Sequence, residues 1–599
     1  MYKIQKMQEL IKKDLSFDQQ KVVNAKGKNV VIAGPGSGKT KTIAYRLAKL
    51  LLETQESDCG VIALSFTNTA VQEIREKLDA LGICFPLSQP HFLGTFDSFL
   101  TQKIFIRYAN RVMRCSDIPQ IVSQSQYKIL DEFLPKENRF ISLGRNTAPK
   151  ALQLGKINYL PNGKLDFTDV LDGIPFWAKK NYDFLELYKA KAAYAKAGLA
   201  THSDVIFWCA KILEEDEWLL RYFQKTYKHW IVDEAQDTSS LHENLLRLLW
   251  ASESDILVVG DPDQAIFEWN QASPDFLLNL SKDIDWQAWE ITENWRSSQN
   301  ICNASNCFRS PIVFSKPSLA VGSFKDLQTE PYLLLYNEDE VDKLPSKFEE
   351  IWYSSLGQSI PKKDVAIVSW THKLLDQIRK NLDIRDYTTN LGSNLIDAIV
   401  EYTDSRDKGY KTFEILMCQL LLGRPSATER DLKKIGFEFD EWNHWLSVLL
   451  YTINLDYKNL AIDSFLQQAR KVLENEIKKK GFDIKLSTKI RFKTKPDVLY
   501  SLDEIREQRK SENNQIPIKT IHKVKGMTLS GIMLVGTKEE VEQWVLGVDL
   551  QTNISKEQRR MAYVAMTRPQ QLLVVALPVG TDEAILKHPA WKQGGFRKV

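Results

Sequence analysis

The residues best suited to chemistry form a glycine-rich segment at positions 33–40, Ala-Gly-Pro-Gly-Ser-Gly-Lys-Thr. It follows an apolar run and precedes a helical pattern, which is the setting of a phosphate-binding loop. Backbone N–H groups of such a loop curl around phosphates, and the start of the helix adds positive potential. The loop residues are Gly34, Gly36, Ser37 and Gly38. Lys39 supplies a point charge and Thr40 a hydroxyl placed for Mg²⁺, so the segment predicts a nucleoside-triphosphate site.

Two adjacent carboxylates, Asp233 and Glu234, follow another apolar run at residues 230–232. Such a pair suits a triphosphate site, because one group can hold a cation while the other acts on water. We expect Asp233 to hold Mg²⁺ through water, and Glu234 to orient and deprotonate the attacking water. A helix cap is the alternative role, and the loop upstream makes it the weaker one.

Three further residues, Gln264, Arg296 and Arg568, are candidates for contacting the γ-phosphate. Gln264 follows the next apolar run and carries an uncharged group that can bridge a phosphate and a water molecule. A guanidinium on the γ-phosphate stabilises charge that develops in the transition state, so both arginines are candidate arginine fingers. A surface salt bridge is the commoner role of a single arginine, and the order of the surrounding motifs favours the catalytic role.

The elements that must position these residues alternate between strands and helices, which predicts an α/β fold with doubly wound parallel sheets. Strand-like runs lie at residues 29–33, 61–66, 230–233, 256–260, 364–368, 531–535 and 572–576, with helical patterns at 42–52, 70–78 and 373–382. We expect two RecA-like lobes, each with a mainly helical insertion. The first lobe comprises 1–100 and 226–290 with a basic insertion at 101–225, and the second comprises 291–384 and 511–599 with a shorter insertion at 385–510.

Charge and composition narrow the class of protein. The 599 residues carry a net charge of only +3, yet residues 101–200 hold 16 basic against 9 acidic side chains. A local basic region is typical of contact with a nucleic-acid backbone, although a solvated helical face explains it equally well. No run is long and apolar enough to span a membrane, and the N-terminus lacks the apolar core of a signal peptide. With seven scattered cysteines, we expect a cytoplasmic protein with no membrane partner.

Taken in order, the chemically suited segments resemble the motifs of superfamily 1 helicases of the UvrD/Rep/PcrA type. The matching segments are residues 15–20, 33–40, 65–70, 94–99, 232–237, 260–269, 294–297, 520–527 and 559–568. The resemblance implies ATP as substrate, Mg²⁺ as cofactor, and an ATP-dependent helicase or translocase that moves 3′→5′ on single-stranded or tailed duplex DNA. It also implies work in DNA repair, recombination or defence.

The resemblance also assigns roles to single residues. Gln19 is expected to read the adenine, Trp295 to stack on one face of it, and Lys41 to meet the other face. The residues at positions that contact single-stranded DNA in the family are Phe66, Asn68, Thr95, Phe267, Trp269 and His522. Stacking of bases on aromatic rings tolerates any sequence, while core packing is the alternative for Phe267 and, less so, for Trp269.

Several positions depart from the family pattern. Thr528 stands where a glutamate commonly meets the ribose, Asp97 where a histidine is frequent, and Asn270 where an arginine commonly follows the tryptophan. These departures and the compact second insertion leave a second hypothesis open: a DNA-stimulated sensor subunit beside a nuclease partner in a phage-defence complex, with weak unwinding. Another kind of P-loop enzyme, such as a GTPase or a transporter ATPase, is disfavoured because no guanine-reading Asn-Lys-x-Asp motif is present.

Overall fold

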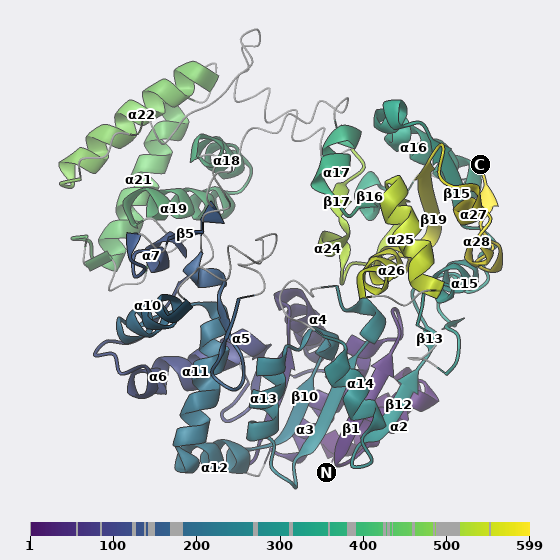
Figure 1. Ribbon diagram of the computed structural model, residues 1–599, viewed down its shortest axis with the longest axis horizontal. Helices are drawn as coiled ribbons and strands as arrows, with labels where there is room; N and C mark the ends of the chain where they lie inside the picture. Colours follow the sequence, from purple (N-terminus) through teal and green to yellow (C-terminus); the bar gives the residue numbers. More distant parts are fainter. Residues whose placement is uncertain are drawn as a thin grey trace. The chain divides into compact units, whose positions relative to one another are not determined.

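The computed structural model contains two six-stranded sheets in which every neighbouring pair of strands is parallel (Figure 1). The structure describes residues 2–55, 58–83, 87–122, 127–136, 139–141, 150–151, 153–167, 184–266, 273–310, 315–357, 360–379, 391–422, 427, 432–433, 435–457, 462–482, 486, 515–549 and 553–599. The predicted α/β class with parallel sheets is confirmed.

The first sheet has the strand order β12-β1-β11-β10-β2-β3. Its strands are β1 (Lys28–Ala33), β2 (Gly60–Ser65), β3 (Phe92–Thr95), β10 (Tyr227–Val232), β11 (Asp255–Gly260) and β12 (Gln287–Ile291). Helices cover both faces, so successive residues of a strand enter different cores: Val30 faces one cluster of buried side chains and Val31 the other. Burial on both faces explains why the central strands are continuous apolar runs.

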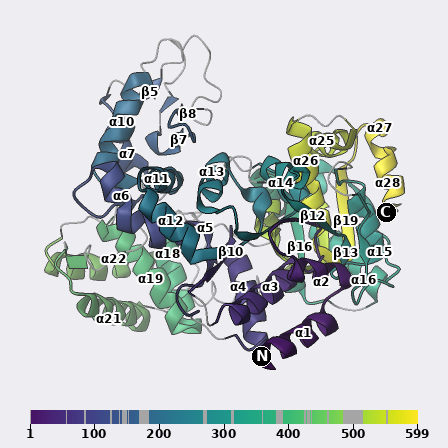
Figure 2. The same ribbon diagram turned by 90° about the horizontal axis from the view of Figure 1, so that it is seen from below.

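One face of this sheet is covered by α1 (Tyr2–Asp14), α2 (Phe17–Asn24), α3 (Lys39–Glu53) and α4 (Asn68–Ala80). These four helices lie beside one another, as Figure 2 shows. The opposite face packs against α5 (Phe96–Phe99), α11 (His202–Glu215), α13 (Ser240–Leu249) and α14 (Asp275–Lys282). Both ends of the nucleotide-binding loop are therefore fixed, by β1 before it and α3 after it.

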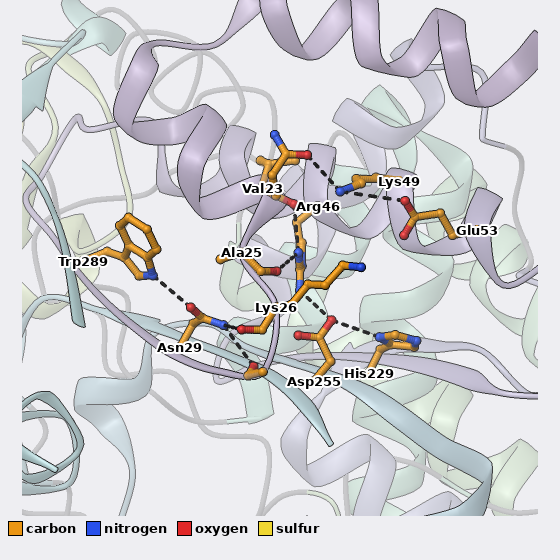
Figure 3. A network of polar contacts seen from close by, with 12 residues as sticks. Val23, Ala25, Lys26, Asn29, Arg46, Lys49, Glu53, His229, Asp255 and Trp289 are labelled. Atoms are coloured by element: carbon orange, nitrogen blue, oxygen red, sulfur yellow. Dashed lines mark hydrogen bonds and ion pairs between the residues drawn. The ribbon is translucent and has the colours of Figure 1, made fainter. Parts of the chain in front are cut away.

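A network of polar contacts joins α2, α3 and the sheet at the edge where the strands begin (Figure 3). Arg46 of α3 donates to the carbonyl oxygens of Val23, at 2.9 Å, and Ala25, where α2 ends. The same guanidinium pairs with Asp255 of β11 at 2.6 Å, and His229 of β10 lies 3.1 Å from that carboxylate. The buried Arg46 guanidinium thus connects α2, α3 and β11.

The second sheet has the order β17-β16-β18-β19-β15-β20. Its strands are β15 (Tyr332–Tyr336), β16 (Val365–Ser369), β17 (Ile518–Thr520), β18 (Leu529–Val535), β19 (Pro569–Pro578) and β20 (Arg597–Lys598). The helices packed with it include α15 (Gln299–Asn306), α16 (Leu344–Leu356), α17 (His372–Arg379), α24 (Ile521–Val524), α25 (Lys538–Asp549), α26 (Asn553–Met566), α27 (Glu583–Leu586) and α28 (Pro589–Gln593).

Residues between β3 and β10 form helices and three short ladders. Among the described residues there, further α-helices are α6 (Ile106–Met113), α7 (Tyr127–Asp131), α10 (Phe184–Lys196) and α12 (Glu217–Thr226). The ladders pair β4 (Gln120–Ile121) with β9 (Leu199–Ala200), β5 (Phe140–Ile141) with β6 (Lys150–Ala151), and β7 (Asn158–Tyr159) with β8 (Leu165–Asp166). Two-residue strands carry no readable hydrophobic period, so the sequence pattern indicates only the helices.

A separate compact unit spans residues 379–516 and has a hydrophobic core of its own. The α-helices described in it are α18 (Leu391–Asp404), α19 (Arg406–Leu422), α21 (Phe439–Tyr457) and α22 (Ile462–Lys479). Residues 1–378 and 517–599 form the other unit. Both six-stranded sheets belong to that larger unit, together with all the predicted catalytic and nucleotide-binding residues.

Within the two six-stranded sheets, the sequence-based expectation omits five strands: β3, β12, β15, β17 and β20. Four of them are edge strands or short strands, and an edge strand such as β12 is exposed along part of its length. Edge strands therefore lack the continuous apolar run by which a central parallel strand is recognised. β15 is an apolar interior strand that carries no predicted site residue after it.

Candidate nucleotide-binding site

The loop after β1 adopts the backbone that its glycines permit. Gly36 and Gly38 have φ angles of +70° and +78°, in the left-handed region that favours glycine. A Cβ atom on Gly36 would lie 2.6 Å from Asn294 Oδ1, so a side chain there would also collide with the neighbouring segment. The Trp295 amide donates to the Gly36 carbonyl at 2.8 Å. The loop is thus held against residues 294–296 on one side and α3 on the other.

This loop borders a cavity of about 480 Å³ that draws residues from both sheets. Its lining residues are Gln19, residues 34–41, Thr67, Thr69, Ala70, Glu73, Lys77, Glu234, Gln264, Trp295, Arg296, Lys525, Gly526, Thr528, Arg568 and Gln570. Every predicted catalytic and nucleotide-binding residue therefore lies on one cavity. Asp233 is buried behind the cavity wall, next to Glu234.

The two carboxylates differ in their electrostatic surroundings although they are adjacent in the chain. Burial, and then the charge of Glu234, raises the pKa of the Asp233 carboxyl. Burial also acts to raise the pKa of Glu234, but the charges of Lys39, Lys525 and Arg568 and a hydrogen bond from Gln236 hold it below its ordinary value. Glu234 is therefore ionised at neutral pH, which is the state in which it can accept a proton.

The backbone at Glu234 turns sharply to present this carboxylate. Its φ angle is +52°, which is rare for a residue with a side chain. The turn directly follows β10, and the Glu234 amide donates to Asp233 Oδ1 at 2.9 Å. An outlier of this kind persists only when the surroundings impose it, and such outliers cluster at functional sites.

A chain of hydrogen bonds runs from Glu234 to an arginine of the second sheet. The Gln236 side chain donates to the Glu234 carboxylate, and Gln236 Oε1 accepts from the Asp261 backbone amide at 3.0 Å. Gln264 donates to Asp261 Oδ2 at 2.7 Å, and Gln264 Oε1 accepts from Arg568 Nη2 at 2.8 Å. The carboxylate and the guanidinium are thus linked through the side chains of Gln236 and Gln264, with Asp261 between these two amides.

The two predicted arginine fingers, Arg296 and Arg568, lie close enough for their charges to repel each other. Arg296 Nη1 donates to the Thr567 carbonyl at 3.1 Å, directly before Arg568 in the chain. Burial, and then the charge of Arg568, lowers the pKa of Arg296 to about 9. Arg568 is buried and Arg296 is half-buried. Two neighbouring cations repel each other, so a bound polyanion such as a triphosphate would relieve the repulsion.

The predicted adenine end is bordered by Gln19, Lys41 and Trp295. The Trp295 ring is 47% exposed, so its face is available for stacking. Gln19 is buried, and its amide donates to the Ser37 carbonyl at 2.8 Å and accepts from the Ser16 amide at 3.1 Å. Lys41 donates to the Asp14 carbonyl at 2.6 Å. In this arrangement Gln19 fixes the loop, and Lys41 points its ammonium toward α1.

The predicted DNA-contacting residues are less uniformly placed. Asn68 is exposed at the start of α4, and Thr95 Oγ1 accepts from the Ser98 amide at 3.1 Å. These two residues line a second cavity of about 750 Å³, whose wall includes Arg75 and Lys103. Its two basic side chains suit a phosphate backbone.

Three aromatic positions and one histidine complete the predicted DNA contacts. The half-buried Phe66 ring stacks on Phe96 at 5.8 Å between ring centroids. His522 Nε2 lies 3.2 Å from the Ile266 carbonyl oxygen. The His522 ring of the second lobe thus contacts the segment that follows Gln264 of the first lobe. Phe267 and Trp269 lie outside the described residues.

Several cavity residues escaped the sequence-based prediction. They are Thr67, Thr69, Glu73, Lys77, Lys525 and Gln570. Thr67, Thr69 and Lys525 lie within recognised motifs, and Lys525 pairs with Asp237 at 2.6 Å. Glu73 sits further along α4, where no motif marks it, and only the packing of α4 against the loop brings it to the cavity.

Comparison with known proteins gives two family matches. The UvrD/REP helicase N-terminal domain matches residues 15–285, and the UvrD-like helicase C-terminal domain matches residues 457–578. DNA helicase II of Haemophilus influenzae is 22% identical over 93% of this chain and 83% of its own length. ATP-dependent DNA helicase Rep of Escherichia coli is 24% identical over 93% of this chain and 90% of its own length.

A third similar protein matches over a shorter stretch. ATP-dependent DNA helicase PcrA of Staphylococcus epidermidis is 27% identical over 50% of this chain and 40% of its own length. Within the described part of the chain, no helix combines the length and apolar character that a membrane crossing requires.

Proposed function

Because the chain belongs to the UvrD/Rep/PcrA-type superfamily 1 DNA helicases, we propose that it hydrolyses ATP in the 480 Å³ cavity and thereby moves along single-stranded DNA. The observation that carries the proposal is the hydrogen-bonded chain from Glu234 to Arg568. It joins a proton acceptor beside the first sheet to a cation beside the second. Such a link makes cleavage of the nucleotide and movement of the sheets mutually dependent.

The proposed roles follow from charge and position. Lys39 and the backbone N–H groups of residues 36–38 hold the β- and γ-phosphates, and Glu234 takes a proton from the attacking water. Gln264 orients that water, while Arg296 and Arg568 stabilise the charge that grows on the γ-phosphate. Trp295 and Gln19 receive the adenine, with Lys41 beside them. Release of the phosphate removes the anion that Lys39 of the first lobe and Arg568 of the second hold between them, which favours separation of the sheets.

Magnesium fits the donors that this site offers. Mg²⁺ is usually bound through one or two protein oxygens together with phosphates and water. Thr40 and Asp233 supply a hydroxyl and a carboxylate, both hard oxygen ligands, and would hold the ion. Ser37 Oγ is buried without a hydrogen-bond partner among the described residues, which leaves it free for a ligand at the loop. When bound, the ion would neutralise phosphate charge.

We propose that the DNA track uses Phe66, Asn68 and Thr95 on the first lobe and His522 on the second, together with Phe267 and Trp269. The two lobes would be the two sheets, with the boundaries expected from sequence: 1–100 with 226–290, and 291–384 with 511–599. Stacking energy of roughly 1–3 kcal/mol per base is enough to hold a strand and small enough to be exchanged in each cycle. The direction proposed is 3′→5′, as in the resemblance.

A single substitution tests the nucleotide site. Lys39→Ala removes the charge that binds the phosphates, so DNA-stimulated ATP hydrolysis should fall by roughly 100-fold or more. Lys211→Ala is the matched control, because Lys211 pairs with Glu214 on α11 and does not border the cavity. Undiminished hydrolysis by the Lys39 variant would contradict the assignment.

Strand separation needs its own experiment. Duplexes with a 3′ tail, a 5′ tail or blunt ends are incubated with the chain and ATP while hydrolysis is followed in parallel. Separation of the 3′-tailed duplex alone is expected. Preference for the 5′ tail would overturn the proposed direction. Hydrolysis without separation of any duplex would favour the sensor role beside a nuclease. The names of the similar helicases mention no nuclease partner.

A further inference from the structure

Glu73 is a carboxylate at the nucleotide cavity to which the sequence assigned no role. It lies on α4, where Ala70, Glu73 and Lys77 form one face of the helix toward the cavity. The side chain is half-buried, and its Oε2 atom accepts a hydrogen bond from Thr40 Oγ1 at 3.4 Å. Glu73 thus meets the hydroxyl that the proposed function gives to the cation.

The charge of Glu73 is felt throughout the cation end of the cavity. It contributes to the raised pKa of Asp233 and works against the lowering of the Arg296 pKa. A third carboxylate beside Asp233 and Glu234 repels a bare triphosphate. The same carboxylate attracts a divalent cation. The repulsion and the attraction are both strong because the charges lie a few ångströms apart in a partly buried site.

Hydrogen-bond chemistry explains why a carboxylate is useful at this position. A hydroxyl that gives a lone pair to a cation keeps its proton and must donate it to an acceptor. Glu73 accepts a hydrogen bond from the Thr40 hydroxyl, and this contact turns the oxygen lone pairs of Thr40 away from α4. Groups that orient a metal ligand in this way typically contribute 10–100-fold to metal affinity.

We propose that Glu73 is a positioning residue for the divalent cation that accompanies ATP, acting through Thr40 and through its own charge. The inference rests on the proposed function and deepens it. It predicts effects of opposite sign: Glu73 strengthens binding of the cation with the nucleotide, and weakens binding of the nucleotide alone.

The test measures binding of a non-hydrolysable ATP analogue to the whole chain, first in EDTA and then across a MgCl₂ series. Glu73→Gln keeps the size and an acceptor but removes the charge. We expect it to bind the analogue in EDTA at least as tightly as the unmodified chain. The MgCl₂ concentration at half-saturation should rise by roughly 10-fold. Glu73→Ala, which removes the acceptor too, should move both quantities in the same directions.

Glu76→Gln is the control, because Glu76 is exposed on the same helix and accepts from Gln72 at 3.1 Å. It should match the unmodified chain in both measurements. Equal half-saturation for the Glu73 variants and the control, or equal weakening with and without Mg²⁺, would overturn this inference alone. Failure of the unmodified chain to bind the analogue at all would instead overturn the proposed function, and this inference with it.

Discussion

At the scale of residues, the candidate site gives neighbouring carboxyl groups opposite pKa shifts. Asp233 and Glu234 share a turn, yet cations and an amide donor surround Glu234, whereas burial dominates at Asp233. The contrast does not come from the residue types, which are both carboxylates. It comes from Lys39, Lys525 and Arg568, which converge on Glu234 from three separate motifs.

Another buried group, His242, gives the first lobe a dependence on pH. Its ring packs edge-on against Phe66 and Phe96, and Nδ1 lies 2.8 Å from Ser239 Oγ. Burial lowers the pKa of His242 to about 4. The unfolded chain takes up this proton at its ordinary pKa of about 6.5, so the folded state is disfavoured as the pH falls from 6.5 to 4.

We predict that acid destabilises the first lobe through His242. Its contribution to the free energy of unfolding is complete above pH 6.5 and decreases by at most roughly 3 kcal/mol by pH 4. His242→Asn keeps an acceptor for Ser239 without a titrating ring, so it should flatten this part of the profile. Urea unfolding at a series of pH values measures the difference. Parallel profiles for the two chains would refute the role of His242.

At the scale of elements, the nucleotide site depends on contacts at the far edge of the first sheet. α2 carries Gln19, and Arg46 of α3 fixes the end of α2 through the carbonyls of Val23 and Ala25 (Figure 3). The pair with Asp255 anchors the same guanidinium to β11, which leads to Gln264. Arg46 therefore connects the helix of the predicted adenine reader to the strand of the predicted phosphate sensor.

Two arginine–carboxylate pairs have the same N–O distance but differ in burial, so comparing them shows what burial alone contributes to stability. Arg46–Asp255 and Arg221–Glu217 both measure 2.6 Å, but the Arg46 side chain is 3% exposed and that of Arg221 is 73% exposed. We predict that Arg46→Met lowers the free energy of unfolding by roughly 3–5 kcal/mol, since it removes the cation from a partly buried carboxylate, which keeps only His229 beside it, and the donor from two carbonyls. Arg221→Met should change it by less than about 1 kcal/mol.

Chemical denaturation of both variants gives these values, and nucleotide binding gives a second readout. Because Arg46 holds the end of α2, its variant should also bind ATP more weakly, whereas the Arg221 variant should bind it as the unmodified chain does. Similar destabilisation in the two variants would mean that burial is not what makes the Arg46 pair important.

At the scale of the whole larger unit, buried charges join the two sheets. Arg559 of α26 pairs with Asp263 at 2.7 Å, with both side chains at most 3% exposed. The neighbouring Arg560 donates to the Ala265 carbonyl at 2.7 Å, and Lys525 pairs with Asp237. Ion pairs of this kind are directional and stabilise one arrangement of the sheets, so they suit surfaces that close in a defined register.

We predict that Asp263→Asn uncouples the sheets. Asp263 accepts from the Ser310 amide with one oxygen and from Arg559 with the other, and Asn keeps only one acceptor. The variant therefore loses one of these hydrogen bonds and leaves the Arg559 cation without a compensating charge, at a cost of about 2 kcal/mol or more. DNA stimulation of ATP hydrolysis should then fall by roughly 10-fold or more, because about 1.4 kcal/mol corresponds to a factor of ten. Nucleotide affinity in the absence of DNA should change less.

ATPase titrations with single-stranded DNA measure this coupling. Glu243→Gln, which removes an exposed pair with Arg247 on α13, is the control and should leave the stimulation unchanged. Full stimulation in the Asp263 variant would show that the buried pair is not needed for communication between the sheets.

The sequence by itself determined the chemistry that contiguous residues can express. Residues 33–40 carry their own backbone instructions, because Gly36 and Gly38 permit the φ angles that the loop requires. Asp233 and Glu234 follow a continuous apolar run, and burial on both faces of a parallel sheet makes such runs recognisable. The parallel sheets could therefore be predicted, whereas edge strands such as β12 could not.

Only the tertiary structure decided which distant groups meet. Glu73 and Lys525 reach the cavity because α4 and the second sheet pack where they do, and nothing in their local sequence requires it. The path from Glu234 through Gln236, Asp261 and Gln264 to Arg568 depends on orientations set by the packing of strands and helices that are far apart in the chain. Short-range periodicity fixes an element and the side it buries, while contacts between elements depend on the whole packed core.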